Sequence, residues 1–184
     1  MTERDLKDVD KDEIADLVVR VRDLLTIAAT HEQAAEFAET TSLLFSLRFL
    51  KSENLEKRLR GLGEIRAMID RAIEKSRFER WLLKQKPGRG RAHWDALPDN
   101  KERPYPSEVI RVGDMRQWLI QNQVTQYLLG PNAHIELVKR SAPILRVFTQ
   151  RFGGDIFDEA LVDLVWKCQQ GKHEEMVRVV YNLI

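Results

Sequence analysis

The chain has 184 residues, of which 30 are basic and 29 acidic, so its formal net charge at pH 7 is +1. This balance excludes a global field that attracts nucleic acid or an anionic membrane, so a partner must be recognised locally. One cysteine, Cys168, excludes an internal disulfide. The charged N-terminus excludes a cleavable secretory signal, and no apolar run approaches the roughly 20 residues that span a bilayer. We therefore expect a cytoplasmic or nuclear location.

Apolar residues recur at steps of three and four near the N-terminus, the spacing that keeps side chains on one face of a helix. A first helix is expected from about Ile14 to Ala28, and a second from Thr30 or His31 to Lys51. Both should bury one amphipathic face. The apolar stripes are Leu17, Val18, Val21, Leu24, Leu25 and Ala28 in the first helix, and Phe37, Leu43, Leu44, Leu47 and Leu50 in the second.

A third and longer helix is expected to begin at Ser52, whose hydroxyl can cap it, and to extend as far as Lys86. With the second helix it should form a hairpin, because the connection is short. Gly61 and Gly63 lie inside this helix and predict a close approach of a neighbouring helix or a slight bend. The apolar stripe consists of Leu55, Leu59, Leu62, Ile65, Ile69 and Ile73.

The sequence changes character between Lys86 and Ser107, where four of the six prolines lie and the helical period is lost. We expect a long flexible insert over residues 87–106. A basic cluster could contact a phosphate backbone there, with a tryptophan ring stacking on a base. Nearby acidic residues weaken this alternative. The basic and aromatic residues are Lys84, Lys86, Arg89, Arg91, His93 and Trp94, and the acidic ones are Asp95, Asp99 and Glu102.

Further helices are expected after the insert. One runs from Asp114 to Asn122, a short apolar turn at 124–129 follows, and another helix begins at Asn132. Pro143 predicts a kink or a break in that helix. The glycines at 153–154 precede a helix that includes Cys168, and a last helix begins near Lys172. The final residues, 181–184, stop within the helical pattern, so we expect the chain to be a piece of a longer protein.

Catalysis has little support in the sequence. Cys168 could act as a nucleophile only beside a base such as His173, His134 or His31, but it continues an apolar helical stripe and should be buried. No metal-ligand spacing and no phosphate-binding glycine loop are present. We therefore expect no catalytic, cofactor-binding or metal-binding residues in the segment. Trp118 and Trp166 are expected to be core anchors.

These patterns predict an all-α fold, an armadillo/HEAT-like stack of helix pairs with about six to eight helices and a long loop insert. We expect residues 1–184 to form one helical-repeat segment. The alternative is a closed helical bundle. The usual role of such an array is to present an extended surface to another protein.

Three stretches carry a resemblance to a known family: residues 46–70, 115–148 and 158–184, which cover most of the chain from about Leu43 onward. Together they resemble the armadillo-like helical arm of the very large ubiquitin-specific proteases of the fat-facets type. The resemblance implies a parent that removes ubiquitin with a cysteine-protease domain elsewhere in its chain. This segment lacks the family's cysteine and histidine boxes, so Cys168 is not expected to be the nucleophile.

The expected function is therefore that of a non-catalytic interaction scaffold. The resemblance implies that its partners are substrates or regulators of a deubiquitinase, with no membrane and no cofactor. Two alternatives remain at this stage. The chain could be an independent armadillo-like or helical-bundle adaptor, or, less favoured, a nucleic-acid-binding module that uses the basic loop.

Overall fold

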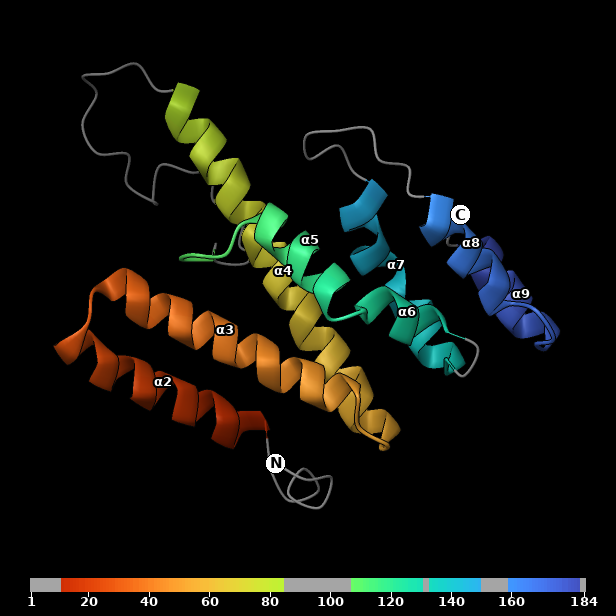
Figure 1. Ribbon diagram of the computed structural model, residues 1–184, viewed down its shortest axis with the longest axis horizontal. Coiled ribbons are helices and arrows are strands. Elements are labelled where there is room, and N and C mark those ends of the chain that lie inside the picture. The colour runs from red at the N-terminus through yellow and green to blue at the C-terminus, as the bar shows by residue number, and fades with distance from the viewer. Residues whose placement is uncertain (1–10, 85–106, 131–132, 150–158, 183–184) are drawn as a thin grey trace.

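The computed structural model describes residues 11–84, 107–130, 133–149 and 159–182. Over these residues the chain forms eight α-helices and no strand, which confirms the predicted all-α class. The helices stack along the long axis of the molecule, with α2 at one end and α8 and α9 at the other (Figure 1). They are α2 (Lys11–Ala28), α3 (His31–Leu50), α4 (Leu55–Lys84), α5 (Val112–Gln121), α6 (Val124–Leu129), α7 (Ile135–Thr149), α8 (Glu159–Cys168) and α9 (Glu174–Tyr181).

The start of α3 is fixed by a capping box. The backbone N–H of Gln33 donates to Thr30 Oγ1 at 3.2 Å, and the Thr30 N–H donates to Gln33 Oε1 at 3.0 Å. These two bonds satisfy donors that a helix start otherwise leaves free. The start predicted near Thr30 or His31 is confirmed. A small separate core then holds α2 against α3, formed by Ile14, Val18, Ala38 and Phe49.

The start of α4 differs from the prediction. Asn54, and not Ser52, caps the helix, because its Oδ1 accepts the N–H of Glu56 at 2.9 Å. Ser52 is buried in the turn, where its Oγ accepts the N–H of Asn54 at 3.1 Å. The chain needs the residues from Lys51 to Asn54 to reverse direction, so the helix begins only at Leu55.

Gly61 lets α3 and α4 touch through their backbones. A Cβ atom placed on Gly61 would lie 2.5 Å from the backbone nitrogen of Leu50, and closer still to the carbonyl oxygen of Ser46. The close approach predicted at this glycine is confirmed. Gly63 is different, because a Cβ there would meet nothing within 4 Å. The prediction of a close contact is therefore wrong for Gly63, which is exposed to solvent.

The long helix α4 connects the two parts of the stack. It packs against α3 on one side and against α5 and α7 on the other, while α8 and α9 pack onto α6 and α7. Every member of the stripe predicted for this helix is buried or packs on the main core, which confirms that prediction. The largest fully buried side chains are Leu50, Leu62, Ile65, Met68, Ile69, Met115, Leu119, Leu128, Leu129, Leu137 and Ile144.

Single residues determine the turn between α5 and α6 and mark the middle of α7. Gln123 adopts a left-handed backbone conformation, with φ of +53°, and turns the chain between α5 and α6. Pro143 lies inside α7, which continues through it, so of the predicted kink or break the break is wrong. The predicted insert at 87–106 and the glycines at 153–154 lie outside the described residues.

A carboxylate on α3 holds the residues that precede α5. Glu39 accepts the backbone N–H groups of Glu108 at 2.8 Å and Ile110 at 2.9 Å, and that of Val109 at 3.3 Å. It also accepts the hydroxyl of Ser107 at 2.7 Å. We call this set of bonds the Glu39 clasp. It joins residues 68 to 71 positions apart in the sequence and sets the chain just before α5.

Further contacts tie the same stretch to the neighbouring helices. The N–H of Ser107 donates to the carbonyl of Arg71 on α4 at 3.1 Å. Lys75 donates to the carbonyl of Glu108, and Arg22 on α2 pairs with the Glu108 carboxylate at 2.6 Å. Three helices therefore converge on the residues that precede α5.

We expect Gly61→Ala to lower the free energy of unfolding by about 1–3 kcal/mol, because the added methyl group must separate two packed backbones. Gly63→Ala is the matched control. It should raise that free energy by about 0.5–1 kcal/mol, since it removes an exposed helical glycine without creating a clash. Urea unfolding followed by circular dichroism measures both. Equal effects of the two variants would contradict the backbone contact.

We expect Glu39→Ala to cost about 1–3 kcal/mol of stability, because three backbone N–H groups lose their acceptor. Glu39→Gln keeps one acceptor oxygen and should cost less. Hydrogen exchange at residues 108–110 should accelerate in both variants. Glu36→Ala, on an exposed position of the same helix, should change stability by less than about 0.5 kcal/mol. Unchanged exchange in Glu39→Ala would refute the clasp.

Candidate protein-interaction surfaces

Cys168 lies inside the main core, with 1% of its surface exposed, so its predicted burial is confirmed. Burial raises the pKa of its thiol, and the nearby charge of Lys172 opposes this only in part. A protonated, enclosed thiol is a poor nucleophile. The three histidines considered as its base, His31, His134 and His173, are all exposed.

The part of the chain that the structure describes also lacks a group of side chains arranged for metal binding. No three His, Cys, Asp or Glu side chains are grouped there in a way that could hold a metal ion. No described helix is long and apolar enough to cross a bilayer. The basic and aromatic residues at 86–94 lie outside the described ranges. The remaining candidates for a functional site are three exposed surfaces that could bind another protein.

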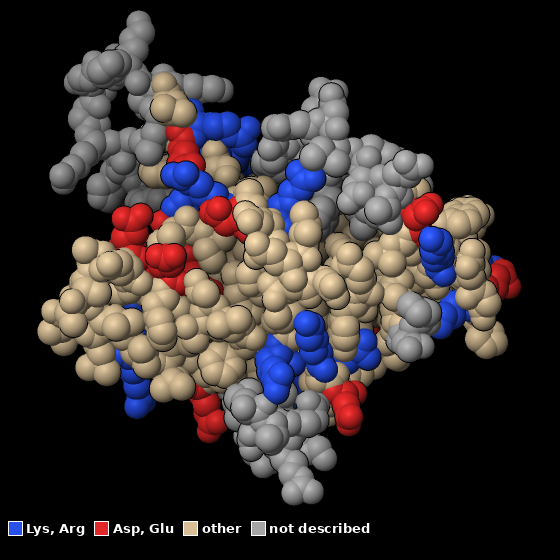
Figure 2. Space-filling model, in the orientation of Figure 1, with Lys and Arg blue, Asp and Glu red and all other residues tan. Residues whose placement is uncertain are grey.

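The first surface is the outer side of the α2–α3 hairpin, which we call the amino-terminal face. Helical spacing of seven residues places Leu17 and Leu24 on one side of α2, and Phe37 and Leu44 on one side of α3. Their exposed fractions lie between 43% and 65%. Figure 2 shows a broad area over these two helices with few charged side chains.

The burial predicted for these four residues is wrong, and the position of α2 explains why. Among the described helices, α2 packs closely only on α3, at the end of the stack (Figure 1). Its inner side buries Ile14 and Val18. The rest of its apolar stripe has no second neighbour among the described helices, and the outward side of α3 is open for the same reason.

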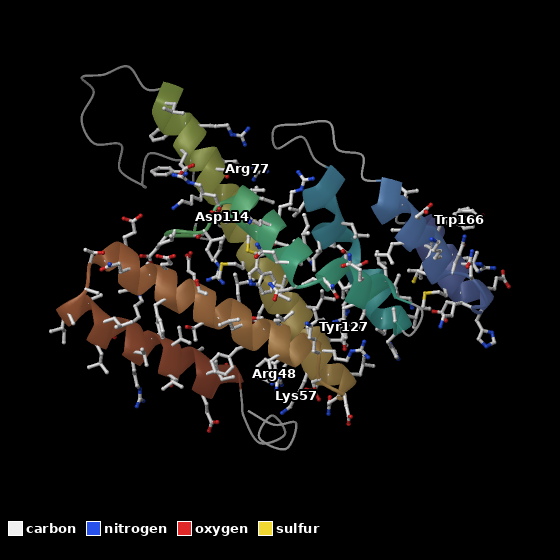
Figure 3. The ribbon with its side chains drawn as sticks, in the orientation of Figure 1. Arg48, Lys57, Arg77, Asp114, Tyr127 and Trp166 are labelled. Carbon is white, nitrogen blue, oxygen red and sulfur yellow. The ribbon has the colours of Figure 1, made fainter. Side chains whose placement is uncertain are left out.

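The second surface, the carboxy-terminal face, is formed by Trp166 on α8 and Tyr181 on α9. The two rings meet edge to face, with centroids 6.1 Å apart and an angle of 82° between their planes. Trp166 is 47% exposed and Tyr181 is 60% exposed. The prediction that Trp166 is a core anchor is therefore wrong, because it lies at the outer end of the stack (Figure 3). Trp118 does pack on the main core, as predicted.

An ion-pair bridge holds α9 to α7 beneath the carboxy-terminal face. Lys139 on α7 donates to Glu175 on α9 at 2.8 Å and to Glu136 at 3.1 Å. The hydrogen bond from Lys139 lowers the pKa of Glu175, and the bonds to Glu175 and Glu136 raise the pKa of Lys139. Both charged forms are thus favoured near neutral pH.

The third surface is a corner where α3 ends and α4 begins. Residues 48–60 contain five basic and two acidic side chains, which leaves a net charge of +3. Lys57 lies 5.9 Å from the ring centre of Phe49, and Arg58 lies 5.1 Å from that of Tyr127 on α6. Figure 2 shows cations along this edge, and Figure 3 labels Arg48 and Lys57 where α3 ends and α4 begins.

Sequence reasoning missed this corner, because the local charge pattern predicts that its cations are paired. The basic residues alternate with glutamates at i,i+4, a pattern that predicts a solvated helix face with paired charges. In the structure Arg60 pairs with Glu56, at 3.2 Å. Lys57 and Arg58 turn instead toward aromatic rings on other helices. That outcome depends on tertiary contacts that no local pattern contains.

Comparison with known proteins supports the fold. The model of the family described as the UBP24/USP9X/USP9Y ARM repeat matches residues 36–184, so α2 precedes the matched region. No solved structure matches significantly.

Curated relatives include the ubiquitin carboxyl-terminal hydrolase puf of Drosophila melanogaster, 25% identical over 136 residues, which are 73% of this chain. Ubiquitin carboxyl-terminal hydrolase 34 of Homo sapiens is 33% identical over 60 residues, or 33% of this chain. The matched parts span only 3% and 2% of those two proteins.

The family match covers most of the chain and all of the helices from α4 to α9. It agrees with the stacked helices of the structure and confirms the resemblance found in the sequence. The chain therefore belongs to the ARM-repeat family of the large ubiquitin-specific proteases UBP24, USP9X and USP9Y.

Proposed function

We propose that this segment is a non-catalytic protein-interaction scaffold of a large ubiquitin-specific protease. Ubiquitin removal is then performed by a domain outside these residues, and the segment binds substrates or regulators of that enzyme. The proposal rests on the family, whose relatives are ubiquitin carboxyl-terminal hydrolases of far greater length.

The observation that carries the proposal is the exposure of large apolar side chains on both end faces. Isolated exposed leucines are ordinary, but exposed apolar side chains grouped on one face are typical of protein interaction sites. The carboxy-terminal face adds an exposed tryptophan and tyrosine, residue types that dominate binding energy at interfaces. The two faces therefore suit protein partners.

The buried thiol supports the non-catalytic part. Cys168 is enclosed by the core between α8 and its neighbours, and its raised pKa disfavours the thiolate. A cysteine protease requires an accessible thiolate beside a base. The exposed apolar faces and the buried thiol of Cys168 favour a binding role over a catalytic one.

The chain should not cleave a fluorogenic ubiquitin substrate. Cys168→Ala should leave that result unchanged, and turnover that disappears in this variant would refute the non-catalytic role.

We expect Trp166→Ala to weaken capture of a partner that binds the carboxy-terminal face by about 2 kcal/mol, or roughly thirtyfold in affinity. The double variant Leu17→Gln/Leu44→Gln tests the amino-terminal face in the same way. Quantitative affinity capture with mass spectrometry compares each variant with the unchanged chain. Gln117→Ala, an exposed change on α5, is the control. Identical partner recovery from all four chains would refute a binding role for both faces.

A further inference from the structure

We infer that the corner between α3 and α4 binds an acidic segment of a partner protein. We call it the cationic corner and define it by Lys51, Lys57 and Arg58, with Arg48 and Arg60 at its margins. The inference deepens the proposed scaffold function, on which it rests, by giving the chemistry of one partner contact.

Lys57 is the cation of this corner that most needs a partner. Its ammonium nitrogen has no hydrogen-bond partner in the described residues and is shielded from solvent. An ammonium that lacks both water and a counter-charge is costly. The ring of Phe49 offsets only part of this cost, since a cation–π contact contributes about 0.5–2 kcal/mol. A carboxylate that docks at the corner supplies the missing partner once the flexible lysine side chain rotates toward it.

Within the described ranges, Arg58 and Lys51 are the other two unpaired cations of the site. Arg58 lies over the Tyr127 ring, and its Nε has no hydrogen-bond partner among the described residues. Its guanidinium is held in place by the ring, which favours a two-point contact with a carboxylate. Lys51 is exposed just after the end of α3 and has no carboxylate partner in the described part of the chain.

Cations elsewhere on the described surface are often neutralised within the molecule. They pair with carboxylates at distances between 2.6 and 3.6 Å, as in Arg22–Glu108, Arg111–Glu79, Lys139–Glu175, Lys167–Asp163 and Arg178–Glu174. Lys51, Lys57 and Arg58 differ because three successive basic side chains at one corner lack such a pair. This unpaired charge attracts an external anion, which reaches the exposed Lys51 directly.

An acidic protein segment suits the corner better than a nucleic acid. Three unpaired cations neutralise about three phosphates at most, whereas nucleic-acid modules commonly make about 6–10 phosphate contacts. Glu53 and Glu56 lie in the same corner and repel a continuous phosphate backbone. Separate carboxylates on a peptide can meet the cations and avoid these glutamates.

The test measures binding of a fluorescein-labelled decapeptide of alternating glutamate and aspartate to the whole chain by fluorescence anisotropy. We expect binding that weakens as NaCl rises from about 0.05 M to about 0.3 M, because the contact is electrostatic. Lys51→Glu, Lys57→Glu and Arg58→Glu should each raise Kd about two- to fivefold. The triple variant should raise it at least about tenfold, because like charges then face each other.

Lys167→Glu is the matched control, since it makes the same charge change on α8, where the lysine is paired with Asp163. It should leave Kd unchanged. Lys51→Glu keeps the test valid if the Lys57 variant folds poorly, because Lys51 is exposed. Equal weakening by Lys167→Glu overturns the inference, as does unchanged binding in the triple variant. Tighter binding of a ten-nucleotide thymidine oligomer would also overturn it.

Failure of this inference is distinguishable from failure of the scaffold function. The face variants at Leu17, Leu44 and Trp166 should reduce partner recovery and leave binding of the acidic peptide unchanged. The corner variants should weaken peptide binding whatever the faces do. Loss of the peptide effect alone therefore removes the cationic corner and leaves the scaffold proposal standing.

Discussion

The carboxylate of Glu39 is the contact on which the arrangement of the two halves depends. Residues 107–110 precede α5, and three of their N–H groups and one hydroxyl converge on this one side chain. A charged acceptor forms stronger bonds than a neutral one and satisfies donors that would otherwise be orphaned beside the helices. The clasp therefore sets where α5 begins, and through α5 it sets how α6 and α7 approach the long helix α4.

Gly61 is the second constraint, because its missing side chain lets the backbones of α3 and α4 come into contact. Where α3 and α4 cross, the space that a side chain would fill is occupied by the backbone of α3. The hairpin is therefore rigid at its base, and its position relative to the main core follows from the apolar stripe of α4. The cationic corner lies at the same base, so its backbone belongs to this rigid hairpin. Such rigidity lowers the entropy that a binding event must overcome.

The sequence predicted the centre of the molecule better than its ends. The stripe predicted for α4 is correct because neighbours cover it on several sides, and the start of α3 near Thr30 was predicted because its signals are local. Periodicity marks an apolar face, but it does not tell whether another helix covers that face. Leu17, Leu44 and Trp166 were misjudged for this reason. The Glu39 clasp depends on contacts that lie 68 to 71 residues apart, which no local pattern encodes.

The apolar faces and the cationic corner contribute differently to the binding of a partner. Apolar end faces supply affinity, because burying their exposed side chains removes apolar area from water, but they discriminate poorly among apolar partners. Charged groups contribute less net affinity, yet they favour one sign of partner and set its orientation. The amino-terminal face and the cationic corner both draw on α3, which carries Leu44 and then Arg48 one turn later. A partner that presents an apolar stripe followed by acidic residues would therefore engage one helix with both kinds of contact.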